Sequence, residues 1–183
     1  MYVPADASPV AGTARESVLA IGRAYGVDDD RLMEHTDRLL VLFDLADKAD
    51  EHTLSLSTGQ RKKVVLCAAL AAETPVMLLD EPFAGGLDPS GILALKRVLR
   101  HRVEREEATI VVATPVPELV AELADRVAVL RGGQVIAYET VEGLRQLAGT
   151  TRDDARFDEV YERLANPKAL ANIEQYFSGG GRA

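Results

Sequence analysis

Two adjacent carboxylates follow a short apolar run near the middle of the chain. Asp80 and Glu81 come directly after the run Val76–Leu79, and Pro82 follows them. Such a run predicts a buried strand, and ligands of open α/β sheets bind at the carboxyl ends of the strands. The pair suits nucleotide hydrolysis, in which one carboxylate holds Mg²⁺ and a second orients the attacking water. A polar strand end before a proline turn is the alternative interpretation, and the pair alone does not decide between them.

A second candidate site is the segment Leu-Ser-Thr-Gly-Gln, which ends twenty residues before Asp80. Small and hydroxylated residues at a helix start expose backbone N–H groups, and the helix dipole adds positive potential there. Ser57, Thr58, Gly59 and Gln60 therefore suit a phosphate anion, with Gly59 allowing close approach of backbone. The alternative is that Ser57 only caps the helix, and taken alone this segment favours that alternative.

The part of the chain before these carboxylates predicts three helices after an irregular segment at 1–12. Thr13 and Glu16 form a capping-box pattern that begins the first helix, and the acidic run at Asp28 begins the second. The third is predicted over 57–72. Because its second part is apolar nearly all round, we expect this helix to be buried.

From Pro75 onward, short apolar runs alternate with helical patterns. This alternation predicts an α/β unit whose strands form a parallel sheet. Two more helices are expected within 151–177, followed by a flexible tail over 178–181. The predicted elements of the α/β unit are strand 76–79, a helix with Asp88 as its cap and Pro89 at its first position, strand 109–113, helix 117–124, strand 126–130 and, after Gly132–Gly133, a return strand at 135–138.

Composition excludes several classes of protein. The net charge of -8 and the pI of about 4.9 argue against sequence-independent binding of nucleic acid and against docking to anionic lipid. Cys67 is the single cysteine, so no internal disulfide forms, and it is expected to be a core residue in a reducing compartment. The three histidines lack metal-ligand spacing. Without a long apolar run or signal peptide, the chain is expected to be cytoplasmic, with any membrane connection made through a partner.

The order of the motifs is more specific than any one of them. Leu-Ser-Thr-Gly-Gln, a helix, Val-Met-Leu-Leu-Asp-Glu-Pro and then Gly86–Pro89 resemble the nucleotide-binding subunit of ABC transporters. The first segment matches the signature motif of that family, with Thr58 in place of the usual glycine. The segment Ala124–Val135 is similar to the strand and hairpin that close the fold. The resemblance covers residues 1 to about 148.

The resemblance implies a role for each candidate residue. Asp80, at the end of Walker B, holds Mg²⁺, Glu81 is the catalytic glutamate, and Asp88 belongs to the D-loop. Two subunits of this family sandwich ATP head to tail, so the signature residues 57–60 contact the γ-phosphate of ATP bound by the opposite subunit. The implied cofactors are ATP and Mg²⁺. The implied partners are a second ATPase subunit and a transmembrane transporter subunit, which place the chain at the cytoplasmic face of a membrane.

The fold implied by the resemblance is an α/β P-loop NTPase of the RecA-like, ABC type, missing its N-terminal strands and carrying a helical subdomain. Residues 1–74 are expected to be a Q-loop remnant and the helical subdomain, 75–148 the second half of the RecA-like core, and 149–183 a C-terminal helical extension with a Gly-rich tail. In the family, the Walker A strand lies between the strands that match 109–113 and 126–130. We therefore expect these two strands to face a gap or to close on each other, with poor solubility for the chain alone.

The sequence also departs from the family at defined positions. No Gly-x-x-x-x-Gly-Lys-Ser/Thr occurs in the chain, so the phosphate cradle and its lysine are missing. Ala5 stands where the Q-loop glutamine usually sits, and Pro115 stands where the switch histidine usually follows its strand. The link at 83–86 is one residue longer than usual. The basic run Arg61–Lys63 is expected either to face phosphate or to form a solvated turn.

Three functional hypotheses follow. The first is an ATP-binding subunit of an ABC transporter without its Walker A part, which by itself binds ATP weakly and does not hydrolyse it, because catalysis of phosphoryl transfer depends on positioning and electrostatics. The second is a non-catalytic partner that supplies only its signature motif to another chain's site, and the absent Walker A, Ala5 and Pro115 favour it. The third, an ABC ATPase of DNA repair or translation, is disfavoured by the acidic composition.

Overall fold

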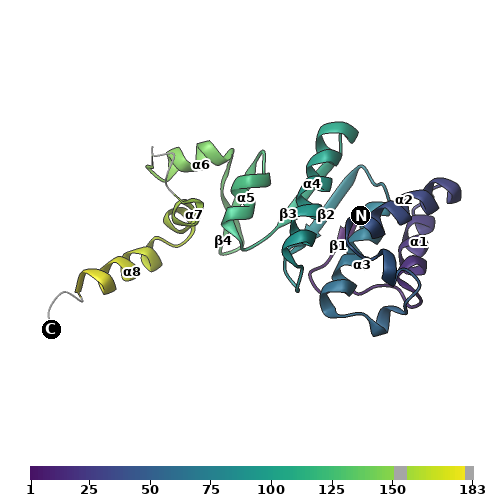
Figure 1. Ribbon diagram of the computed structural model, residues 1–183. Coiled ribbons are helices and arrows are strands. Elements are labelled where there is room, and N and C mark those ends of the chain that lie inside the picture. Colours follow the sequence, from purple (N-terminus) through teal and green to yellow (C-terminus); the bar gives the residue numbers. More distant parts are fainter. Residues whose placement is uncertain (151–155, 180–183) are drawn as a thin grey trace. The chain divides into compact units, whose positions relative to one another are not determined.

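The computed structural model describes residues 1–150 and 156–179, and contacts divide the chain into two compact units. Unit 1 covers Met1–Thr114 and unit 2 covers Pro115–Ala183. Unit 1 combines a parallel sheet with helices and two short 3-10 turns, and Figure 1 shows α1, α2 and α3 gathered as one helical group. Its elements in chain order are β1 (Tyr2–Val3), α1 (Ala14–Ala24), α2 (Asp29–Leu42), the turns Ala46–Lys48 and Thr53–Ser55, α3 (Thr58–Ala71), β2 (Val76–Asp80), α4 (Pro89–Glu106) and β3 (Thr109–Ala113).

Side-chain caps begin the helices of unit 1 where the sequence predicts them. The Thr13 hydroxyl accepts from the N–H of Glu16 at 3.1 Å, and the Glu16 carboxylate accepts from the N–H of Thr13 at 2.8 Å. This reciprocal pair is the predicted capping box of α1. Asp28 caps α2 by accepting from the N–H of Arg31 at 3.2 Å. Both predictions are confirmed. Such caps can be predicted from sequence because each depends on only about four consecutive residues.

The second half of α3 is the core of unit 1. Every residue of Val64–Ala72 is buried, and α3 packs against both α1 and α2. Cys67 lies inside this segment, where its thiol approaches the carbonyl oxygen of Leu39 at 3.7 Å. Burial raises the pKa of the Cys67 thiol well above its usual range, so the group stays protonated. The predicted buried helix and the predicted core role of Cys67 are both confirmed.

The sheet of unit 1 has the order β1–β2–β3, and both pairings are parallel. The prediction of irregular structure over 1–12 is wrong at its start, because Tyr2 and Val3 pair with Leu78 and Leu79. The amino group of Met1 also donates to the carbonyl oxygen of Val76 at 3.0 Å. A two-residue strand has no periodicity of its own, so only its distant partner reveals it.

Strand β2 buries one face rather than two. Met77 and Leu79 are buried, whereas Val76 and Leu78 are exposed. The prediction of a fully buried strand is therefore wrong for these residues. On the exposed face, Tyr2, Leu78 and Val111 lie in register across the three strands and form an apolar row.

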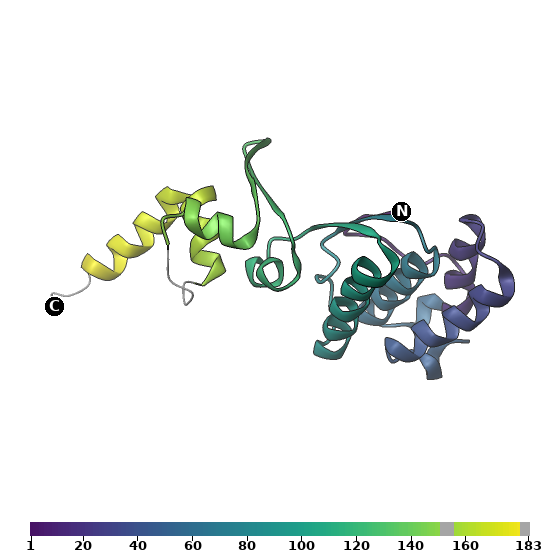
Figure 2. The same cartoon turned by 90° about the horizontal axis from the view of Figure 1, so that it is seen from above.

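Unit 2 is built around an antiparallel hairpin and several helices. Figure 2 shows the hairpin of β4 and β5 as a long arm that extends from the helices of its own unit. The core of unit 2 consists of Val129, Leu144, Phe157 and Val160. The elements are α5 (Pro117–Leu123), β4 (Val127–Arg131), β5 (Gln134–Glu139), α6 (Val141–Leu147), α7 (Phe157–Ala165) and α8 (Pro167–Gly179).

The expected third parallel strand is not part of the sheet of unit 1. β4 pairs with β5 alone, and β3 pairs with β2 alone among the described residues. Gly132 and Gly133, both with positive φ, make the tight turn that favours local antiparallel pairing.

Two elements of unit 2 differ from the sequence prediction. Helix α6 was not predicted, although Thr140 caps it by accepting from the N–H of Gly143 at 3.0 Å. Helix α8 continues through Gly179, so the predicted tail is wrong at Ser178–Gly179, and its last two residues lie outside the described residues. Among the helices of the described chain, none combines the length and apolar character that a bilayer crossing requires.

We expect the stability of unit 1 to fall as the pH drops below about 6.5, the ordinary pKa of histidine. His35 is half-buried, and its Nδ1 lies 3.0 Å from a carboxylate oxygen of Glu73. Burial lowers the pKa of His35, and Glu73 opposes the shift without cancelling it. The unfolded chain then binds more protons than the folded chain between the two pKa values, so acid favours unfolding.

Urea unfolding at pH values from 7.5 to 5 measures this effect. His35→Gln should flatten the decline in the free energy of unfolding below pH 6.5, whereas His101→Gln, at an exposed position, should not. Equal slopes for the wild type and His35→Gln would show that His35 does not control the decline.

Candidate functional site

The predicted phosphate-binding segment begins α3 with a second capping box. The Ser57 hydroxyl accepts from the N–H of Gln60 at 3.3 Å, and the Gln60 side-chain oxygen accepts from the N–H of Ser57 at 2.9 Å. Arg61 closes the turn by donating to the carbonyl oxygen of Leu56 at 2.8 Å. The capping interpretation of Ser57 is therefore confirmed. It does not compete with anion binding, because a cap leaves other N–H groups of the first turn available.

Thr58 and Gly59 supply those remaining donors. Within the described residues, no hydrogen-bond acceptor is found for the backbone N–H of either residue. Both lie in the first turn of a 14-residue helix, where the dipole favours negative charge. The side chain of Thr58 is exposed, so this end of α3 is open to solvent.

Gly59 makes a close backbone contact with the loop that follows β2. A Cβ atom placed on Gly59 would lie 2.4 Å from the carbonyl oxygen of Gly86, which is far inside van der Waals contact. Gly85 and Gly86 both adopt positive φ, 84° and 90°, so the loop turns sharply toward α3. The structure thus explains the need for glycine at position 59 by the approach of Gly86.

Asp80 and Glu81 lie at the carboxyl end of β2, as the sequence predicts. Glu81 has φ of 44°, and its N–H donates to the carbonyl oxygen of Ala113 at 2.8 Å. This left-handed conformation is unusual for a residue with a side chain and costs about 1 kcal/mol. Both side chains are partly exposed, and within the described chain no hydrogen bond or ion pair engages either carboxylate.

The two carboxylates fit one part of a Mg²⁺ site. Mg²⁺ prefers oxygen ligands and is usually held by one or two carboxylates together with water and the phosphates of a nucleotide. In the part of the chain that the structure describes, no cluster of three or more ligand side chains exists. Asp80 and Glu81 would therefore hold the ion only together with water and nucleotide oxygens.

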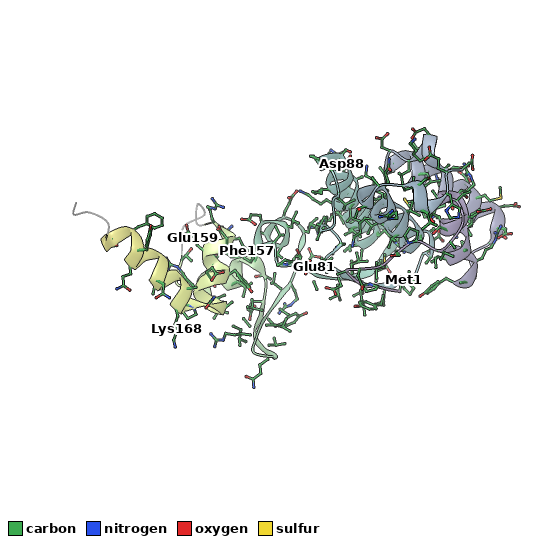
Figure 3. All side chains as sticks on the ribbon, turned by 90° about the horizontal axis from the view of Figure 1, so that it is seen from below. Met1, Glu81, Asp88, Phe157, Glu159 and Lys168 are labelled. Atoms are coloured by element: carbon green, nitrogen blue, oxygen red, sulfur yellow. The ribbon has the colours of Figure 1, made fainter. Side chains whose placement is uncertain are left out.

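Asp88 joins the loop after β2 to both adjoining helices. One oxygen accepts from the N–H of Gly91 at 2.9 Å, so Asp88 caps α4 as predicted, with Pro89 at the first helical position. Lys63 of α3 lies 3.0 Å away and forms an ion pair with it. The Lys63 ammonium and then the Gly91 N–H lower the pKa of Asp88. Figure 3 labels Glu81 and Asp88, the residues near the two ends of this loop.

The basic residues after the signature segment are not a solvated turn. Lys62 and Lys63 lie in the second turn of α3, and each is only 6% exposed. The predicted solvated turn is wrong for both lysines, because both lie at the beginning of the buried part of α3. Lys62 donates to the carbonyl oxygen of Ala5 at 3.2 Å. The signal in the sequence for the burial of the two lysines is their position directly before the apolar run that begins at Val64.

Ala5 occupies the position where the family usually has the Q-loop glutamine, and its backbone is bound by Lys62. Ala5 follows β1 and is exposed, with its carbonyl oxygen held by Lys62. Pro115, at the position of the switch histidine, is the first residue of unit 2, between β3 and α5.

Known proteins are similar to this chain in sequence. Residues 3–84 match the family model described as ABC transporter. The daunorubicin resistance ATP-binding protein DrrA3 of Streptomyces coeruleorubidus is 34% identical over 140 residues, 76% of this chain and 44% of that protein. The sulfate/thiosulfate import ATP-binding protein CysA of Xanthomonas campestris is 41% identical over 110 residues, 60% of this chain and 32% of that protein. The chain thus spans less than half the length of these curated relatives.

A solved structure supports the same assignment. The structure described as the ATP binding subunit of an ABC transporter superposes with a TM-score of 0.78 at 28% identity, covering 89% of this chain and 67% of that one. The matched residues 3–84 include the signature segment and the carboxylate pair. The chain therefore belongs to the family of ABC-transporter ATP-binding subunits and has the P-loop NTPase fold of that family.

Proposed function

We propose that the chain forms the signature and Walker B part of an ATP-binding subunit that couples ATP binding and hydrolysis to transport through a membrane partner. One observation carries the proposal, namely that α3 and the loop that follows Asp80 and Glu81 are in direct contact. Gly59 of α3 packs against Gly86 of the loop, and Lys63 of α3 forms an ion pair with Asp88. A phosphate contact on α3 can therefore be transmitted to the loop that begins at the carboxylates.

Each candidate residue has a separate task in this proposal. The first turn of α3, with Ser57, Thr58, Gly59 and Gln60, donates hydrogen bonds to the γ-phosphate of ATP held by a second ATPase subunit. Asp80 contributes an oxygen ligand to Mg²⁺, which supplies charge neutralisation at the phosphates. The Glu81 carboxylate orients water for attack, and Asp88 holds the D-loop against α3.

The remaining family features are proposed on the same basis. Residues 1–74, 75–148 and 149–183 correspond to the helical subdomain, the second half of the RecA-like core and a C-terminal extension. Further core strands would cover two surfaces of the sheet, namely the edge of β3 that has no partner strand among the described residues and the exposed apolar row. A transmembrane subunit would hold the protein at the cytoplasmic face of its membrane.

A second candidate function is a non-catalytic partner that contributes only its signature motif. The 183 residues hold no Gly-x-x-x-x-Gly-Lys-Ser/Thr, and Ala5 and Pro115 replace two side chains that the family uses at the γ-phosphate. These departures leave the first turn of α3 intact. A site completed by another chain's Walker A and Walker B needs only that turn.

Mixing this chain with a complete ATP-binding subunit of the family tests whether its signature segment can complete the ATP site of the other subunit. The same experiment shows whether this contribution depends on Glu81. The complete subunit should carry an arginine at its own signature serine, so that its homodimer is inactive. We expect this chain alone to release no phosphate from ATP, and the mixture to regain turnover, because α3 supplies the missing contact. Ser57→Arg in this chain should abolish the regained turnover, and Glu81→Gln should leave it unchanged.

Fusion to the Walker A half of the same complete subunit decides between the two candidates. Turnover of the fusion that Glu81→Gln reduces at least a hundredfold supports the catalytic role. If the fusion does not hydrolyse ATP but the mixture regains turnover, the result supports the non-catalytic partner. Turnover by the 183 residues alone, abolished by Glu81→Gln, would contradict the proposal.

A further inference from the structure

Lys62 is a buried cation that no motif explains. Its side chain leaves the second turn of α3 and is only 6% exposed. The ammonium donates to the carbonyl oxygen of Ala5 at 3.2 Å, across 57 positions in sequence. The stem lies against the loop after β2, where a Cβ on Gly85 would be 4.0 Å from Cδ of Lys62. Three separate segments thus fix the position of one charge.

The charges acting on this ammonium are the carboxylates of the candidate metal site. Burial lowers the pKa of Lys62, while the negative charges of Asp80 and Glu81 oppose that change. Neither carboxylate has an ion pair or hydrogen bond among the described residues. The Lys62 ammonium is therefore held where it acts on two carboxylates that are otherwise without a cation.

The contact with Ala5 fixes where the charge lies. Ala5 has no polar side chain, so only its backbone carbonyl can hold a group there. A hydrogen bond to a carbonyl restrains a long, flexible lysine side chain that would otherwise move toward solvent. Ala5 lies two residues after Val3, which pairs with Leu79 of β2, so the restraint holds the ammonium beside the carboxyl end of β2. Among the described residues the ammonium forms no ion pair with either carboxylate.

We propose that Lys62 is a positioning residue that compensates the charge of Asp80 and Glu81 and weakens divalent-cation binding there until a nucleotide adds further oxygen ligands. The proposal rests on the function proposed above, because it takes Asp80 and Glu81 as the metal ligands. A fixed positive charge repels a dication by Coulomb's law, more strongly than in water because the site is partly buried. Metal then binds well only together with nucleotide phosphates.

Binding of Mn²⁺ alone, measured by electron paramagnetic resonance of the free ion, tests the proposal without nucleotide or a second subunit. Lys62→Met removes the charge and keeps the apolar stem, and Lys62→Gln also keeps an N–H donor for the Ala5 carbonyl. Both should bind Mn²⁺ about 3- to 10-fold more tightly than the wild type. Lys62→Arg should match the wild type. Lys48→Met, which makes the same change in net charge at a lysine paired with Glu51, should also match it.

The gain must disappear when Asp80→Asn is added to Lys62→Met or Lys62→Gln. Mn²⁺ affinity that is unchanged or undetectable in both variants would overturn the proposal, as would a gain that survives Asp80→Asn. If Lys62→Met fails to fold, Lys62→Gln decides the outcome. Failure of the turnover experiments with the Mn²⁺ results intact would reject the proposed function and leave the charge effect of Lys62 standing.

Discussion

Replacing Gly59 with alanine is expected to destabilise the protein by about 1–3 kcal/mol, because the new methyl group would meet backbone that cannot rotate away. The added Cβ would lie 2.4 Å from the carbonyl oxygen of Gly86. In a helix without such a contact the same change stabilises by about 1 kcal/mol, so here the sign of the effect is diagnostic. Either α3 or the loop after β2 must shift to accept the methyl group.

Urea unfolding of Gly59→Ala beside Thr58→Ala measures the effect. Thr58 is exposed and occupies the preceding position of the same helix, so its replacement should change the free energy of unfolding by about 0.5 kcal/mol or less. A Gly59→Ala variant at least as stable as the wild type would contradict the close contact with Gly86. The loss should be larger for Gly59→Val, whose side chain adds branching at the same atom.

Replacing Arg102 with alanine should cost about 2–4 kcal/mol, because its buried guanidinium donates to two backbone carbonyl groups and also pairs with Glu106. Arg102 is 5% exposed and lies on α4. It donates to the carbonyl oxygen of Leu70 at 3.4 Å and to that of Thr74 at 3.1 Å, and it pairs with Glu106 at 3.1 Å. Alanine would leave the two carbonyl groups without this donor and would open a space between α3 and α4.

The matched control is Arg97→Ala, which removes the same side chain from an exposed position of α4. Its effect on the free energy of unfolding should stay within about 0.5 kcal/mol. Equal losses for the two variants would show that helix propensity, and not the buried contacts, controls the result. Because Arg102 links the end of α3 to the entry of β2, its loss should also loosen the spacing between the signature helix and the carboxylates.

Local hydrogen-bonding chemistry explains which parts of the fold the sequence could predict. The capping box at Thr13 and the caps at Ser57 and Asp88 each depend on a window of about four residues, and all three occur in the structure. The reciprocal bond that makes the Ser57 cap a capping box appears only in the structure. The placement of the carboxylates after an apolar run is equally local, since β2 ends at Asp80. These features need no knowledge of distant partners.

The errors have the opposite origin. The pairing of β1 with β2 joins strands that lie far apart in sequence. The contact of Lys62 with Ala5 spans 57 positions, and a lysine in isolation always reads as a surface residue. Only its location inside a helix that must be buried could have indicated its role. The candidate site could thus be predicted as a list of motifs but not as a network of contacts.

The left-handed backbone at Glu81 opposes the stability of the fold to the role proposed for this carboxylate. Glycine or asparagine would adopt a φ of 44° at lower cost, so selection for stability alone would not keep a glutamate there. A lineage that no longer needed the carboxylate would gain stability by losing it, whereas the surrounding turn, held by the Ala113 carbonyl, would survive the exchange. Under the proposed catalytic role of Glu81, this conformation would exchange some stability of the fold for activity.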